Sequence, residues 1–203
     1  MCLRVDWSVV PAWVEAVGSV VTAGVALAAY RAWRPQLRGA SKHTAAAKIL
    51  EAARLARYHF YDARNTVITA GEFPAEYWAS KARSNAQEAD GFAKVYQGRW
   101  KHLWPQIEQL AILRAKAGAL FGEEVASALD ELARKARELQ GFMENHLSEL
   151  RAGPEIVSQW ADQEWVRRVR NSVSVDPQDH TDDYSKEFEE KFEKLEKLVK
   201  PHI

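Results

Sequence analysis

The sequence of 203 residues contains a single cysteine, Cys2. One thiol excludes a disulfide framework and any metal site built from several thiolates, and it is typical of a reducing compartment. Lysine and arginine together balance aspartate and glutamate at 28 each, so the formal net charge is zero. A neutral chain gives no support to a general polyanion-binding role, and we expect no nucleic-acid partner.

Motifs that mark catalytic or cofactor sites are also missing from the sequence. The glycines at 118 and 122 are not followed by lysine, so they do not form a phosphate-binding loop. None of the six histidines has a glutamate three residues before it, which excludes the Glu-x-x-His pairs of di-iron bundles. No His-Glu-x-x-His zinc helix occurs either. The sequence therefore predicts neither a cofactor nor a metal site.

One weak catalytic candidate remains, a histidine with a carboxylate one helical turn away. His59 and Asp62 have this spacing, and His146 and Glu149 repeat it. A histidine oriented by a carboxylate can act as a general base, but a buried structural histidine is the commoner explanation. An enzyme that uses His59 and Asp62 is accordingly the third of our functional hypotheses.

The longest apolar stretch runs from Val9 to Tyr30 and contains one charged residue, Glu15. About 20 such residues suffice for a helix to cross a membrane. Cations and an aromatic residue follow at once: Arg31, Trp33, Arg34 and Arg38. The bias of positive charge toward this flank predicts a single-pass anchor over residues 1–34 in the inner (cell) membrane, with the N-terminus outside and the rest cytoplasmic.

Two other interpretations of this stretch stay open. It could be an Ala/Val-rich core helix of a soluble bundle. Short apolar runs usually belong to such helices, and the fully uncharged part of this stretch is only slightly longer than those runs. It could also be a cleaved signal peptide, since Ala26-Leu27-Ala28 has the small-x-small form of a cleavage site. The dense arginines that follow argue against cleavage and export.

Small residues recur along one side of the apolar stretch. Residues of this kind let two membrane helices approach closely. We predict a helix-association face with this composition: Glu15, Gly18, Ser19, Thr22 and Ala26. A carboxylate within a span is a functional-site hypothesis by default, although Glu15 could equally reach the headgroups.

The rest of the chain predicts an all-α body, an antiparallel bundle of about five to six helices. Pro35 and Gly39 suggest a juxtamembrane break over 35–41, followed by the bundle over 42–170. Heptad-like apolar stripes and Gly/Pro stops place the helices at 41–70, 74–97, 105–117, 122–152 and 154–171. A polar linker is expected over 171–182, before a charged amphipathic helix within 183–203.

A few side chains in the body are candidates for an interaction surface. Cations and indoles alternate at Arg99, Trp100, Lys101 and Trp104, and the last helix carries Phe188 and Phe192 on one face. Such a mixture can lie at a membrane surface, although core packing is the default for the tryptophans. The aromatic face of the last helix must be covered either by the body or by a partner.

Charge is distributed unevenly along the chain. Residues 1–70 hold nine Lys/Arg against four Asp/Glu, and residues 118–203 hold twelve against nineteen. A basic end beside anionic lipid fits a membrane-anchored protein. The arrangement resembles, in outline, bacterial single-pass inner-membrane proteins with a helical cytoplasmic part.

Our leading hypothesis is a membrane-tethered helical interaction or assembly protein without catalytic activity. Its expected partners are the lipid bilayer and a second copy or another protein that binds through helices. The alternative is a membrane-associated effector of the pore-forming or defence type, assembled through the small-residue face with Glu15.

Overall fold

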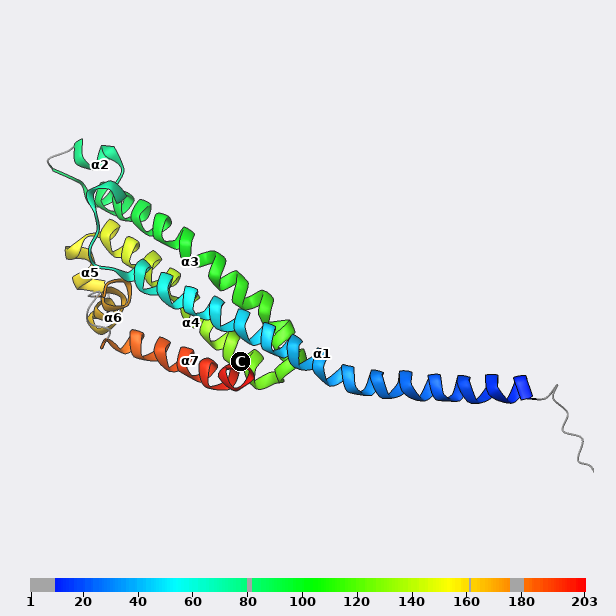
Figure 1. Ribbon diagram of the computed structural model, residues 1–203. Helices are drawn as coiled ribbons and strands as arrows, with labels where there is room; N and C mark the ends of the chain where they lie inside the picture. The colour runs from blue at the N-terminus through cyan, green and yellow to red at the C-terminus, as the bar shows by residue number, and fades with distance from the viewer. Residues whose placement is uncertain (1–9, 80–81, 161, 176–180) are drawn as a thin grey trace, which may run out of the picture. The chain divides into compact units, whose positions relative to one another are not determined.

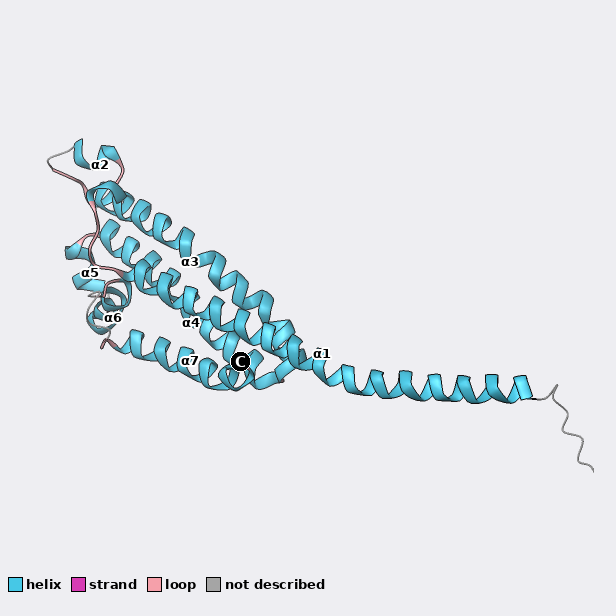
Figure 2. Cartoon of the chain, viewed as in Figure 1, coloured by secondary structure: helices cyan, strands magenta, loops and turns pink. Residues whose placement is uncertain are grey.

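The computed structural model describes residues 10–79, 82–160, 162–175 and 181–203, and it is helical almost throughout (Figures 1 and 2). These residues form no β-strand; one isolated bridge pairs Asn65 with Val175. The predicted all-α class is confirmed. The helices are α1 (Val10–Arg64), α2 (Ala75–Ala79), α3 (Asn85–Phe121), α4 (Glu123–Ala152), α5 (Pro154–Trp160), α6 (Gln163–Val173) and α7 (Asp183–Val199), with 3-10 turns at Ala70–Glu72 and Lys200–His202.

The chain divides into two compact units, Met1–Thr44 and Ala45–Ile203. Helix α1 contributes to both. In the first unit every described side chain of α1 from Val14 to Arg34 is exposed. In the second unit α1 becomes amphipathic at Ala45, and its buried positions then recur every three or four residues as far as Arg64. The change from exposed to buried apolar side chains therefore coincides with the boundary between the units.

The second unit is a helical bundle built from α1 after Ala45, α3, α4 and α7. Figure 1 shows α3, α4 and α7 running side by side. Arg54 pairs with Glu196 at 3.1 Å and Arg57 with Glu189 at 2.8 Å, so α7 is antiparallel to α1. One continuous apolar core joins all four helices; its largest fully buried members include Phe60, Phe188, Ile49, Leu103, Ile107, Leu110, Leu129, Leu132, Leu139 and Leu195.

Helices α4 and α7 are where the predictions placed them. The buried residues of α4 follow the predicted stripe, and positive-φ glycines end it on both sides, Gly122 at 97° and Gly153 at 82°. A glycine adopts this conformation without the steric cost that a Cβ carries. Helix α7 begins at Asp183 because the Asp182 carboxylate accepts a bond from the Ser185 amide at 2.9 Å.

The break predicted over 35–41 is wrong, because α1 runs through it. Pro35 removes only one intrahelical hydrogen bond. The helix continues because strong helix formers such as Ala32 and Ala40 surround this proline. The same helix stops at Arg64, six residues before the predicted end. There the backbone finds other partners: Val175 N donates to Arg64 O at 2.8 Å, and Thr66 N donates to Val175 O at 3.2 Å.

Three further boundaries also need correction. Residues 85–121 form one helix, α3, that continues through Gly98 and Pro105, where we predicted a break. The predicted helix over 154–171 is two helices, and the Asp162 carboxylate caps the second by accepting from Glu164 N at 2.9 Å. The predicted linker over 171–182 begins too early, since α6 extends to Val173 and Val175 pairs with Asn65. Residues 176–180 lie outside the described residues.

Close packing explains a glycine inside α3. The Tyr77 ring lies against Gly91, where a Cβ would overlap it. Phe73 stacks on the same ring at 4.1 Å, the Arg83 guanidinium lies 4.2 Å from its centroid, and its hydroxyl donates to Glu88 at 2.9 Å. The ring is held on several sides, so it has little freedom to move away.

We expect Gly91→Ala to destabilise the bundle by about 1–3 kcal/mol, the usual cost of overpacking. Gly98→Ala is the matched control on the same helix, because a methyl group at this position would meet no neighbouring side chain within 4 Å. That control should gain about 0.5–1 kcal/mol, since alanine favours a helix. Urea titration followed by circular dichroism measures both changes. Equal signs for the two variants would contradict the packing argument.

Candidate functional site

The first unit exposes an unusually apolar helical segment. Val14, Val17, Val20, Val21, Val25, Leu27, Tyr30 and Trp33 all lie on it, each with at least half of its surface accessible and Val20 with 73%. From Val14 to Trp33 there are about 20 residues, which corresponds to roughly 30 Å of helix. Among the described residues, α1 is the one helix long and apolar enough to cross a membrane. Burying this surface would be strongly favourable, so it is a candidate contact surface.

The predicted association face lies within this segment. Glu15, Gly18, Ser19, Thr22 and Ala26 are all exposed. The Ser19 hydroxyl donates to the Glu15 carbonyl and the Thr22 hydroxyl to the Gly18 carbonyl, both at 2.8 Å. Each hydroxyl therefore already has a partner inside its own helix, and neither requires a second helix to satisfy it.

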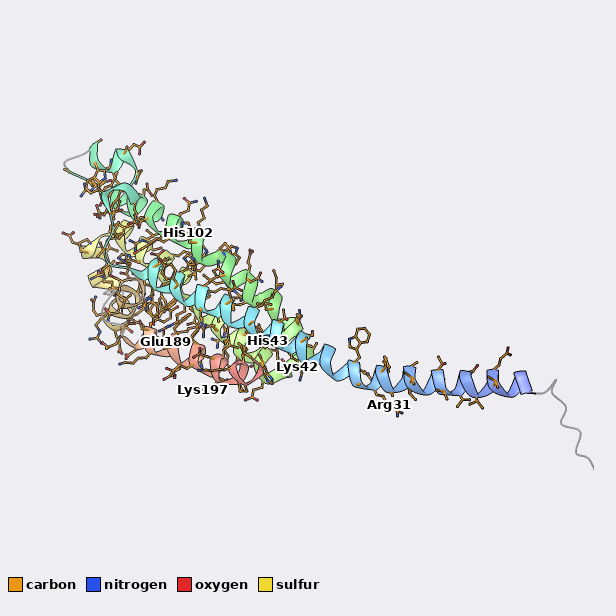
Figure 3. All side chains as sticks on the ribbon, in the orientation of Figure 1. Arg31, Lys42, His43, His102, Glu189 and Lys197 are labelled. Carbon is orange, nitrogen blue, oxygen red and sulfur yellow. The ribbon has the colours of Figure 1, made fainter. Side chains whose placement is uncertain are left out.

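The predicted flank overlaps the C-terminal end of the apolar segment. Arg31, Trp33 and Arg34 are exposed on α1; Figure 3 labels Arg31. The side chain of Arg38 lies outside the described residues. An indole and two guanidinium groups directly after an apolar stretch are the residues that prefer a membrane–water interface.

The catalytic pair predicted at His59 and Asp62 is not formed in the described residues. The His59 ring stacks on His102, with 6.0 Å between centroids, and its buried Nδ1 has no hydrogen-bond partner in the described part of the chain. Asp62 is exposed and instead lines an open cavity of about 600 Å³ together with Lys94, Arg99 and His102. The carboxylate does not orient the imidazole, so the general-base arrangement lacks its geometric basis.

Arg99 belongs to the interior and not to the predicted interaction surface. It is buried, donates to both oxygens of Glu72 at 2.7 and 3.2 Å, and also bonds the carbonyls of Asn65 and Val67. The hydrogen bonds from Arg99 are the main reason that the pKa of Glu72 lies below its usual range. Arg99 thus fastens the segment after α1 to α3.

The neighbours of Arg99 are divided between core and surface. Trp100 is half-buried against the core, while Lys101 is exposed and Trp104 keeps 39% of its surface accessible. The two indoles lie 6.1 Å apart. Only Lys101 and Trp104 therefore remain available for the predicted contact.

Phe188 and Phe192 are likewise buried and do not form an interaction surface. Phe188 stacks on Phe60 with 3.9 Å between ring centroids, and the Arg57 guanidinium lies 5.1 Å from the Phe192 ring. The aromatic face of α7 is therefore covered by the body of the protein.

Sequence reasoning missed a buried arginine at the end of α1. Arg64 is fully inaccessible and connects α1 to the end of α6 and the start of α7. Its position four residues after Phe60, on the same apolar stripe, is the signal that could have identified it. The sequence did show the spacing of His146 and Glu149, but the contact of His146 Nδ1 with the Tyr96 hydroxyl, at 2.6 Å, was not predicted.

Comparison with known proteins yields no significant match among family models, curated proteins or solved structures.

Proposed function

We propose that this protein is a membrane-tethered helical interaction or assembly protein, with the N-terminus outside the cell membrane and the bundle on the cytoplasmic side. The observation that carries the proposal is the run of exposed apolar side chains on α1 between Val14 and Trp33. A continuous apolar surface of this kind marks a membrane or partner contact in a folded protein.

The length and the flank of this segment favour a bilayer as the contact. About 30 Å of helix matches the hydrocarbon thickness of a membrane, and a helix satisfies its own backbone hydrogen bonds there. Arg31 and Arg34 are exposed at its C-terminal end, which by the positive-inside bias supports a cytoplasmic bundle.

The exposed surface of the bundle supports an assembly role. Exposed Lys101 and Trp104 on α3 provide a place where a helical partner could bind.

Cell fractionation with a carbonate wash tests the tether, and we expect the full-length protein in the membrane pellet. Cys2, the one thiol of the sequence, then tests the orientation. A membrane-impermeant maleimide should label it in intact cells. A Cys2→Ser variant that carries Ser148→Cys on the exposed surface of α4 should be labelled only after lysis. Full-length protein in the soluble fraction contradicts the tether, and the reverse labelling pattern contradicts the orientation.

A further inference from the structure

Several cations lie at the C-terminal end of the apolar segment on α1. No acidic residue occurs in the sequence between Glu15 and Glu51. Four cations of this interval are three or four residues apart: Arg31, Arg34, Arg38 and Lys42. At 3.6 residues per turn, these positions fall within about 80° of the circumference of a continuous helix. We call these four residues the basic stripe.

The basic stripe depends on the continuity of α1, which the sequence did not predict. A break over 35–41 would have turned the cations before it and after it in unrelated directions. The helix instead runs without interruption from Val10 to Arg64. The basic stripe therefore keeps one register over roughly 16 Å of helix, at a rise of about 1.5 Å per residue. All of it lies in the first compact unit.

The described cations of the basic stripe have no nearby carboxylate in their own unit. Arg31 and Arg34 are exposed, and Lys42 is partly accessible. Among the described residues of this unit the one carboxylate is Glu15, sixteen positions before Arg31. Further along the same helix the situation differs, since Arg57 forms an ion pair of 2.8 Å with α7. The basic stripe therefore presents a concentrated positive charge to an external anion.

The direction of helical side chains brings the basic stripe close to lipid headgroups. Each Cα–Cβ bond of a helix tilts toward its N-terminus, which in α1 is the side of the apolar segment. Long cationic side chains also bend toward a membrane surface. The headgroup layer is about 5–8 Å thick on each side of a bilayer. With Trp33 at the edge of the hydrocarbon, Arg34 and Arg38 follow by roughly 1.5 and 7.5 Å along the axis, at the depth of this layer.

We propose that the basic stripe binds the headgroups of anionic phospholipids in the cytoplasmic leaflet. This proposal rests on the membrane tether proposed above and adds the class of lipid that surrounds it. A guanidinium group donates two parallel hydrogen bonds to a phosphate, and juxtamembrane cations attract anionic lipid. Helical neighbours three or four residues apart have Cβ atoms about 5–6 Å from each other, so one headgroup contacts two cations of the stripe. A zwitterionic lipid carries its own cation, which the stripe repels.

Native mass spectrometry of the full chain, released from detergent micelles, measures this selection directly. The protein is titrated with an equimolar mixture of phosphatidylglycerol, which is anionic, and phosphatidylcholine, which is zwitterionic. One cation beside an anionic headgroup favours binding by a factor of about five. We therefore expect the phosphatidylglycerol complex of the wild type to exceed the phosphatidylcholine complex at least about fivefold. Replacing all four residues of the basic stripe with glutamine should reduce this ratio to near one.

Two further variants separate the basic stripe from the total charge. The first replaces four exposed cations of the bundle unit with glutamine and should keep the wild-type ratio: Lys116, Arg137, Arg167 and Arg168. The second keeps the charge of α1 but leaves no two cations of this segment three or four residues apart: Arg34→Gln, Gln36→Arg, Lys42→Gln and His43→Lys. It should lower the ratio, because one headgroup then contacts a single cation.

Circular dichroism checks that each variant is folded, and the carbonate wash tests the tether separately. Equal amounts of the two lipid complexes on the wild type overturn the lipid proposal, as does a bundle-unit variant that loses the preference. A wild-type ratio in the second variant also overturns it, since total charge would then suffice. If the wild type still remains in the membrane pellet after the wash, such results leave the tether intact. A soluble full-length protein contradicts the tether itself, and the lipid proposal falls with it.

Discussion

Replacing Arg64 with methionine is expected to lower the free energy of unfolding of the bundle by about 3–5 kcal/mol, the usual cost of removing one partner from a buried ion pair. The guanidinium donates to four groups: Ser172 O at 2.6 Å, Ser185 Oγ at 2.7 Å, Asp182 Oδ1 at 2.8 Å and Asn171 O at 3.0 Å. It also lies about 5 Å from the ring centroids of Phe60 and Tyr184. Methionine fills part of the space but satisfies none of these acceptors.

The expected loss of stability is large because the partners of Arg64 cannot all form hydrogen bonds with water instead. The two carbonyls belong to the last turn of α6, and Asp182 caps α7. Burial alone would raise the pKa of Asp182, but the bonds from Ser185 and the charge of Arg64 outweigh it and keep the pKa below its usual value. Without Arg64 the carboxylate keeps the desolvation cost and loses the compensation.

Arg54→Met is the matched control, ten residues earlier on the same helix. Arg54 also forms an ion pair with α7, through Glu196 at 3.1 Å, but its side chain is 64% exposed. An exposed pair contributes about 0–1 kcal/mol. Urea titration of the full chain, followed by far-UV circular dichroism, compares the two variants. Similar losses in the free energy of unfolding would mean that the buried network around Arg64 contributes no more than an exposed ion pair to holding α1, α6 and α7 together.

The helices that the sequence predicts best are those whose order is local. In α4 the apolar period and the glycines at both ends agree, and in α7 the four-residue spacing of Glu and Lys supports the same helix that the aromatic face requires. Each of these signals lies within a few residues of the structure it specifies. Such agreement across local features is what makes an element predictable.

The break at Pro105 was predicted wrongly because the outcome at this proline depends on packing against distant residues. Pro105 removes one hydrogen bond from α3 at a cost of about 3 kcal/mol in an isolated helix. The buried side chains of Leu103 and Ile107, on either side, hold both halves of the helix against the core. Local propensity contains no information about that packing, so a break was the reasonable but wrong prediction.

Prediction of polar sites from the sequence has the same limit, as the two buried arginines show. An arginine is usually solvated, and nothing near Arg99 or Arg64 in the sequence identifies their partners. Arg99 bonds residues about 30 positions earlier, and Arg64 bonds residues more than 100 positions later. Several acceptors are backbone carbonyls, which have no sequence signature at all.

Replacing Val21 and Val25 together by arginine is expected to release the protein from membranes. Both side chains are exposed, one helical turn apart, near the middle of the apolar segment. An arginine near the centre of a span costs about 2.5–3.5 kcal/mol on an insertion scale, whereas a valine contributes only about −0.3 to −0.6 kcal/mol. The seven valines and one leucine from Val9 to Leu27, which carry most of the apolarity, supply roughly −2.5 to −5 kcal/mol in total, so two arginines exceed this gain.

Flotation of purified protein with liposomes measures this directly, because no other protein is present to retain the helix. Leu55→Arg with Tyr58→Arg is the matched control: both residues are exposed on the same helix, α1, but in the bundle unit. The control should float with the liposomes, and the Val21/Val25 variant should stay at the bottom of the gradient. If wild type and both variants float alike, lipid contacts do not depend on this segment. A third outcome is that none of the three proteins floats although the wild type pellets with cell membranes. The lipid bilayer would then have failed to bury the apolar surface, which is exposed in the chain alone. In that case a protein partner covers this surface in the cell.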